Sequence, residues 1–138
     1  MIELSLSVAV RPTESPEKVA GALENLFPGI VIAAREGRIE GHGGAESLET
    51  FHRLLREQRI LDTARSVMLQ GRLGDAVQFR LNKQAATVSR INFPPEEETL
   101  GSIHVEIRGP AALIDWLAPR TSEGRPIEEI ELEDDDRV

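Results

Sequence analysis

The 138-residue sequence contains no cysteine and no tyrosine, and its aromatic residues are one tryptophan and four phenylalanines. Without cysteine, the chain can form neither disulfide bonds nor thiolate metal sites. With so few aromatic rings, it offers little surface on which unpaired bases could stack. No apolar run approaches the ~20 residues that a membrane-spanning helix needs, and the first five residues lack the pattern of a secretory signal. We therefore expect a cytoplasmic protein that does not associate with membranes.

Motifs for catalysis and for cofactor or metal binding are also missing. Residues 41–44 are glycine-rich but lack the lysine and the spacing of a phosphate-binding loop. His42, His52 and His104 are not spaced as a pair of metal ligands on a helix, and no serine lies in a nucleophile-elbow string. We therefore predict no catalytic residues, no metal and no cofactor.

Positive charge is concentrated in one part of an acidic chain. The net charge is −8, but residues 51–93 contain eight cations and three anions and carry +5. These cations are Arg53, Arg56, Arg59, Arg65, Arg72, Arg80, Lys83 and Arg90. Such a basic segment favours a partner that carries phosphate, such as RNA.

The last sixteen residues are the most acidic part of the chain. Residues 123–138 contain eight acids and two arginines and carry −6. A charge block of this kind is typical of a flexible tail, so we predict a single domain over residues 1–122 followed by a flexible acidic tail. Two roles fit the tail: it increases solubility, or it lies over the basic segment and competes with a polyanion.

Apolar residues alternate with polar ones in three segments, which is typical of strands buried on one side. These segments are 4–10, 77–81 and 103–107, and residues 30–41 form a predicted hairpin around Glu36 and Gly37. Helical spacing over 16–26, 45–70 and 110–117 predicts helices that cover one face of the sheet. The sequence therefore predicts an α+β fold, a two-layer sandwich with a mostly antiparallel or mixed sheet.

The other face of this sheet is predicted to be polar. It would carry Ser5, Ser7, Gln78, Arg80, His104, Glu106 and Arg108. Such a face is either a binding platform or an ordinary solvated surface, and the pattern leaves both open.

Residues 45–70 cannot form one straight helix that packs on a single surface. Their two apolar stripes, Leu48 to Leu55 and Ile60 to Met68, lie about 150° apart at about 100° per residue. We therefore predict a break near Gln58, with Gly71 as the C′ residue at the far end. Beyond the next strand, residues 87–93 read as extended after a turn or bulge around Lys83.

The candidate binding residues lie at this break and at the end of the strand over 77–81. Arg59, Asp62 and Arg65 are spaced to contact one another on a helix, either as a surface ion-pair ladder or with Asp62 orienting an arginine toward an oxyanion. Asn82, Lys83 and Gln84 can bind bases and phosphate or form a polar turn. Arg90 lies beside an amide and an aromatic residue in Arg90-Ile91-Asn92-Phe93.

Several strings resemble an uncharacterised archaeal family of predicted RNA-binding and predicted exosome-associated proteins. These strings are Gln58-Arg59-Ile60-Leu61-Asp62-Thr63-Ala64-Arg65, Leu81-Asn82-Lys83-Gln84-Ala85-Ala86, Asn92-Phe93, Ile114-Asp115-Trp116-Leu117-Ala118-Pro119 and the opening Val10-Arg11-Pro12-Thr13-Glu14-Ser15-Pro16-Glu17-Lys18-Val19. The resemblance covers roughly residues 3–121. It implies a fold similar to the large-subunit ribosomal protein that binds the five-S RNA.

Three functions fit these observations. The first is binding of structured RNA through a basic surface, with Arg59, Asp62, Arg65, Asn82, Lys83, Gln84 and Arg90 as contacts. The second is a protein-interaction subunit of an RNA-processing complex that does not touch RNA. The third is an enzyme acting on a phosphorylated small molecule. The sequence does not indicate an oligomeric state.

Overall fold

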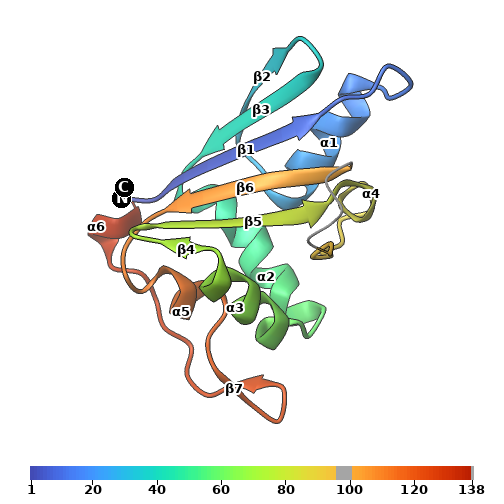
Figure 1. Ribbon diagram of the computed structural model, residues 1–138. Coiled ribbons are helices and arrows are strands. Elements are labelled where there is room, and N and C mark those ends of the chain that lie inside the picture. The colour runs from blue at the N-terminus through green and yellow to red at the C-terminus, as the bar shows by residue number, and fades with distance from the viewer. Residues whose placement is uncertain (96–100, 138) are drawn as a thin grey trace.

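A six-stranded antiparallel sheet carries a single layer of helices in the computed structural model, which describes residues 1–95 and 101–137 (Figure 1). The strand order is β2-β3-β1-β6-β5-β4, and every neighbouring pair is antiparallel. The strands are β1 (Glu3–Ala9), β2 (Val31–Arg35), β3 (Arg38–Gly43), β4 (Arg72–Leu73), β5 (Ala76–Asn82) and β6 (Ser102–Arg108). The predicted α+β class and the predicted hairpin are confirmed.

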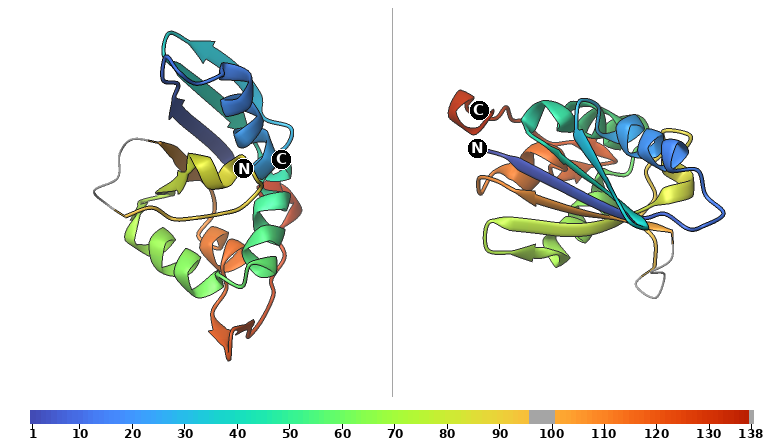
Figure 2. Two further views of the ribbon diagram at one scale, coloured as in Figure 1. Left: turned by 90° about the vertical axis from the view of Figure 1, so that its right-hand side faces the viewer. Right: turned by 90° about the horizontal axis from the view of Figure 1, so that it is seen from above.

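The helices lie on one side of this sheet. They are α1 (Pro16–Leu26), the 3₁₀ turn η1 (Ala45–Leu48), α2 (Glu49–Glu57), α3 (Leu61–Gln70), α4 (Lys83–Ala86), α5 (Leu113–Leu117) and α6 (Asp134–Arg137). A small hairpin of β7 (Thr121–Ser122) and β8 (Arg125–Pro126) follows α5. Figure 2 shows α1 and α2 above the sheet when the molecule is seen from the top. Among the described residues no helix covers the middle of the other sheet face, although α3 borders that face beside β5.

The core lies between the sheet and the helices, where it contains most of the aromatic side chains. All four phenylalanines form one line of ring contacts, with centroid distances of 5.2 Å from Phe27 to Phe51, 5.8 Å from Phe51 to Phe79 and 6.1 Å from Phe79 to Phe93. Three of these rings are buried, and so is Trp116. Aromatic area that could stack on bases is therefore used to hold the layers together.

The predicted helix break is confirmed, and its geometry is that of a Schellman motif. Arg59 has φ 57°, in the left-handed region. The Ile60 amide donates to the Leu55 carbonyl and the Arg59 amide donates to the Arg56 carbonyl, both at 3.1 Å. A Schellman motif ends a helix with this pair of hydrogen bonds. The chain then turns, so α2 and α3 bury their separate stripes against different neighbours.

Two local predictions were wrong. Residues 87–93 were expected to be extended but begin with a turn over 87–89. The chain leaves β5 directly into the short helix α4, whose first turn is capped by the Asn82 side chain at 2.9 Å from the Ala85 amide. Gly71 is not a left-handed C′ residue, since its φ is −91°. Glycine is needed there because a Cβ would lie 1.8 Å from the Gln78 carbonyl oxygen.

The C-terminal segment, which we predicted to be a flexible tail, packs along the helical layer in the structure. Leu132 is buried, and Ile130 packs against the core. Glu129 accepts two hydrogen bonds from the Arg56 guanidinium, at 2.6 and 2.7 Å. The N-terminal amine lies 3.8 Å from the Asp136 carboxylate, so the two chain ends lie close together.

Candidate functional site

The open face of the sheet presents polar side chains from four neighbouring strands in ordered rows. The strand register places Arg80, His104, Ser7 and Glu40 side by side across β5, β6, β1 and β3. The next row along the strands is Gln78, Glu106, Ser5 and His42. Directly opposed residues on one sheet face have Cβ atoms about 5 Å apart, so each row brings these groups within reach of a single ligand.

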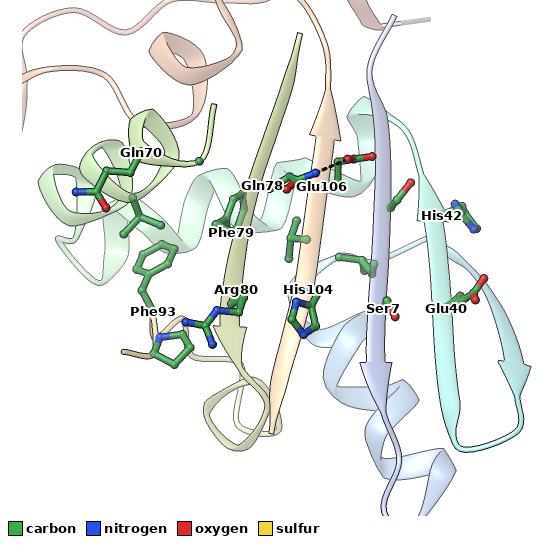
Figure 3. A pocket seen from close by; sticks show the side chains of 16 residues that line it. Ser7, Glu40, His42, Gln70, Gln78, Phe79, Arg80, Phe93, His104 and Glu106 are labelled. Atoms are coloured by element: carbon green, nitrogen blue, oxygen red, sulfur yellow. Dashed lines mark hydrogen bonds between the residues drawn. The ribbon is translucent and has the colours of Figure 1, made fainter. Parts of the chain in front are cut away.

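This face is hollowed into a cavity of about 750 Å³. Both rows lie on its floor, and Figure 3 shows Arg80 and His104 next to each other on neighbouring strands. One wall is mostly apolar, because Val67 of α3, Phe93 and Pro94 stand there beside β5, together with the polar Gln70. The hollow therefore combines a polar floor with an apolar wall, which is typical of a ligand site.

Formal charge on the open face differs from that of the whole chain. The side chains of this face include four arginines and three glutamates: Arg35, Arg38, Arg80, Arg108, Glu3, Glu40 and Glu106. The face thus carries about +1, with the histidines counted as neutral, in a protein with a net charge of −8.

Both acids on the floor of the hollow are held by neighbouring groups. Glu40 accepts from the Arg38 guanidinium at 2.7 Å, and Glu106 accepts from the Gln78 amide at 2.8 Å (Figure 3). Arg108 also lies 3.5 Å from the Glu106 carboxylate. The floor therefore presents hydrogen-bond donors and acceptors in fixed positions. Its negative electrostatic potential is small, because a paired carboxylate repels an anion less than an unpaired one.

Lys83 is buried, although the sequence placed it among the candidate RNA contacts. Its side chain is 3% exposed, and its Nζ atom donates to the Ala9 carbonyl at 2.9 Å and to the Glu14 carboxylate at 2.8 Å. The hydrogen bond from Lys83 lowers the pKa of Glu14 below its ordinary value. Lys83 therefore ties the start of α4 to the end of β1 and to the loop after it, and its side chain is buried.

The other residues of the α2–α3 string mostly contact the protein itself. Arg65 donates to the Asp115 carboxylate at 2.8 Å and to the Ala118 carbonyl at 3.0 Å. Asp62 accepts from the Thr121 hydroxyl. Both contacts join α3 to the segment after β6, so these positions hold the fold together, and Asp62 orients neither arginine in this structure.

Three of the residues predicted from the sequence to contact RNA are exposed and do not join distant parts of the fold. Gln84 and Arg90 lie on the surface around α4, and Arg59 projects from the α2–α3 break. The Gln58 amide joins these regions, because it donates to the Ile91 carbonyl at 2.9 Å and accepts from the Ile91 amide at 2.7 Å. Arg59 and Arg90 each adjoin a residue of this clamp, and they form the part of the predicted basic surface that remains accessible.

The sequence placed the polar floor correctly but missed the hollow. Alternation along each strand identified Ser5, Ser7, Gln78, Arg80, His104 and Glu106 as outward-facing. Glu40, His42 and the wall of Val67, Gln70, Phe93 and Pro94 were missed, since their place depends on strand order and on the path of residues 90–94. The alternation of Arg38, Glu40 and His42 around Ile39 was the signal available for β3.

Two further features of the described residues bear on the class of protein. Within residues 1–95 and 101–137, no three His, Cys, Asp or Glu side chains are grouped as metal ligands. None of the helices in the same residues has the length and apolar character needed to cross a bilayer.

The chain is similar to a known protein family and to several archaeal proteins. Residues 3–109 match the family model described as RNA binding. The chain is 46% identical over 135 residues to a UPF0200/UPF0201 protein of Archaeoglobus fulgidus, covering 94% of this chain but 41% of that relative. It is 41% identical over 154 residues to a UPF0201 protein of Methanosarcina acetivorans, covering 96% of this chain and 94% of that protein.

A solved structure supports the fold as well. The crystal structure of a UPF0201 protein from Methanococcus jannaschii, 37% identical to this chain, superposes with a TM-score of 0.83 and covers 91% of this chain and 99% of that one. The order of strands and helices described above is therefore shared with a protein of clear sequence similarity.

Proposed function

We propose that this chain, which belongs to the archaeal UPF0201 family, is an RNA-binding protein that contacts RNA with the open face of its sheet. The observation that carries the proposal is the hollow on that face, with its ordered rows of donors and acceptors. The match of residues 3–109 to a family model described as RNA binding gives the class of ligand.

The chemistry of the open face suits contacts to phosphate and sugar more than base stacking. Guanidinium, imidazole, hydroxyl and amide groups supply hydrogen bonds of the kind that proteins make to nucleic-acid backbones. Of the two phenylalanines that line the hollow within the described residues, Phe93 is the more exposed. RNA would then be recognised by its backbone and by its shape, as in the readout of structured RNA.

Arg59 and Arg90 provide a second, exposed cationic area beside the Gln58–Ile91 clamp. Because residues 90–94 lead from Arg90 to the wall of the hollow at Phe93 and Pro94, one RNA could reach both areas. In this proposal Gln84 also contacts RNA, whereas Asp62, Arg65, Asn82 and Lys83 act through the fold.

The proposal is tested by measuring RNA affinity as a function of salt. A fluorescently labelled stem-loop RNA is titrated with the protein at several salt concentrations, and log K should fall linearly with log salt, by about 0.7 to 0.9 for each phosphate neutralised. Arg80→Gln and Arg59→Gln should each reduce this slope by about 1. Arg53→Gln is the matched control, since Arg53 is ion-paired with Glu57 on the helical side. A protein that binds no RNA even at low salt would disprove the function.

A protein-interaction role is the second candidate, and one observation favours it. Within the described residues, at least four cations of the basic segment are ion-paired: Arg53 with Glu57, Arg56 with Glu129, Arg65 with Asp115 and Lys83 with Glu14. The chain would then serve as an accessory subunit of an RNA-processing assembly, such as the exosome association that the family resemblance implies. Partners that remain bound after ribonuclease treatment would favour this role, whereas complete loss would favour direct RNA binding.

Catalysis is not part of the proposal, nor is any metal or cofactor. An enzyme acting on a phosphorylated small molecule would need the clustered residues of the α2–α3 string and of α4 to line a deep pocket. The hollow on the open face is lined by none of Arg59, Asp62, Arg65, Asn82, Lys83 and Gln84. We further propose that the protein acts in the cytoplasm, where RNA processing in archaea would place it.

A further inference from the structure

We infer that the hollow takes one unpaired ribonucleotide of the bound RNA, and that Glu106 distinguishes ribose from deoxyribose by accepting a hydrogen bond from the 2′-hydroxyl. This inference rests on the proposed function and specifies the ligand of the same site. It follows from the size of the hollow and from the arrangement of three kinds of side chain within it.

The size of the hollow suits a single residue of a nucleic acid. Ligand sites are about 300–1,000 Å³ in volume, and this cavity measures about 750 Å³. A nucleotide from a loop, a bulge or an end can be splayed into a space of this size.

The phosphate fits best at the Arg80–His104 pair. These residues oppose each other directly on β5 and β6, and Ser7 follows in the same row on β1. A guanidinium, an imidazole N–H and a hydroxyl can then donate to one phosphate group. Arg80 also donates to the Pro95 carbonyl at 2.8 Å, which holds the guanidinium beside the wall of the hollow.

The sugar fits at the neighbouring row, where Glu106 is the acceptor. Glu106 lies two residues along β6 from His104, a separation of about 7 Å along a strand, which is comparable to the span from a phosphate to the sugar hydroxyl of one nucleotide. The Gln78 amide holds the carboxylate at 2.8 Å, and the Glu106 side chain retains 31% exposure. A carboxylate with a free lone pair accepts from a hydroxyl but repels phosphate, so it favours ribose at this position.

The base fits against the apolar wall. Val67, Phe93 and Pro94 stand beside β5 on the same side as Arg80, and Figure 3 shows the Phe93 ring next to the Arg80 side chain. A planar base can pack on this wall without a stack of several aromatic rings, which agrees with the scarcity of aromatic residues.

The test compares RNA and DNA of the same sequence. Fluorescence anisotropy should give wild-type protein an RNA affinity about 10-fold or more above its affinity for the matching single-stranded DNA, since a hydrogen bond to a charged group contributes about 1.5–3 kcal/mol. RNA with 2′-O-methyl groups at every residue should bind as weakly as DNA, and this comparison needs no protein variant.

Glu106→Gln should reduce the RNA-to-DNA affinity ratio by about 10-fold because the amide oxygen is a weaker acceptor. His104→Ala should weaken RNA and DNA alike and leave the ratio unchanged. Glu3→Gln, the same charge change on the same sheet face but outside the hollow, is the control and should leave the RNA-to-DNA affinity ratio unchanged. Melting temperatures identify any variant that fails to fold, and the modified RNA then decides.

Three outcomes would count against these ideas, and they can be told apart. If RNA binds but wild-type protein does not prefer it over DNA or over 2′-O-methyl RNA, the sugar contact is absent and the inference is overturned. If a folded Glu106→Gln variant keeps the full preference, Glu106 is not its source, and the inference is also overturned. If the protein binds neither nucleic acid, the proposed function itself fails.

Discussion

The ion pair between Lys83 and Glu14 provides the sharpest test of whether a sequence candidate is structural. Lys83 is 3% exposed, whereas the Glu14 side chain is 21% exposed. Removing the two charges should therefore have unequal effects. Glu14→Gln leaves a buried ammonium without its counter-ion, and Lys83→Met leaves a carboxylate that water can reach and that still accepts from the Arg11 amide at 2.9 Å.

The expected magnitudes follow from this asymmetry. Breaking a buried ion pair by removing one partner costs about 3–5 kcal/mol when the remaining charge is fully buried. Glu14→Gln should fall near the lower limit, at about 3 kcal/mol, because the ammonium keeps its bond to the Ala9 carbonyl. Lys83→Met should cost about 1–2 kcal/mol, mainly from the Ala9 carbonyl that loses its donor. The double variant should be more stable than Glu14→Gln alone.

The assay is urea unfolding followed by tryptophan fluorescence, with the free energies of unfolding of the four proteins arranged as a double-mutant cycle. The pKa of Glu14 is lowered from an ordinary value of 4.5, so its contribution is complete above pH 4.5 and is lost as the pH falls through its lower value in the folded state. The stability difference between wild type and Glu14→Gln should shrink accordingly at acid pH.

Two results would refute this reasoning. One is a free energy of unfolding for Glu14→Gln within about 0.5 kcal/mol of wild type, the size of a surface substitution. The other is a smaller salt slope of RNA binding for a folded Lys83→Met variant, because a residue that acts only through the fold neutralises no phosphate.

Three further predictions concern single positions. Gly71→Ala should lower the free energy of unfolding by more than about 3 kcal/mol in the same urea assay. The alanine Cβ would lie 1.8 Å from the Gln78 carbonyl oxygen, so the β5 backbone must move. A variant as stable as wild type would contradict this prediction. Arg59→Gly should raise stability by about 1 kcal/mol because φ is 57° and should lower RNA affinity; unchanged affinity would remove Arg59 from the interface. Burial, and then the positive charge of Arg56, lowers the pKa of His52 below its ordinary value of 6.5. The free energy of unfolding should therefore fall as the pH drops below 6.5. Because the Glu129 carboxylate raises the pKa of His52, Glu129→Gln should lower this pKa further in an NMR titration, and a rise would contradict the prediction.

The sequence predicts the layers of this fold well because they depend on periodicity. Buried and exposed positions alternate along β1 and β6 as expected, and the mismatch between two helical stripes located the α2–α3 break. The break is visible in the sequence because a straight helix cannot bury two opposite stripes, so the chain must turn wherever the phase changes.

Burial of charged groups could not be predicted in the same way. Lys83 follows a polar residue and precedes another, which makes it look like part of a surface turn. Its partners, Ala9 and Glu14, lie 74 and 69 residues away in the sequence, and only the pairing of β1 with β6 and of β6 with β5 brings them together. A charge pair of this kind is a property of the strand order.

The contacts of the C-terminal segment could not be predicted, for a related reason. Its acidic composition is typical of disorder, but two apolar residues, Ile130 and Leu132, reach the core, and Glu129 meets the partly buried Arg56. Arg56 also donates to the carbonyls of His52, Trp116 and Leu117. An arginine with so many fixed acceptors supplies a specific site for one carboxylate, and average composition does not show such a site.

Residues in the strings that resemble the family therefore mainly connect distant parts of the chain. Gln58 is bonded to Ile91, and Arg65 to Asp115 and Ala118. Arg59 is different, because it occupies a left-handed position where glycine costs less, and its side chain is exposed. Its backbone cost, about 1–2 kcal/mol, is not offset by a hydrogen bond or ion pair of its side chain within the described residues. A strained, exposed cation beside a rigid clamp is the kind of position where strain accompanies function, and this makes Arg59 the member of the string with the strongest claim to a ligand.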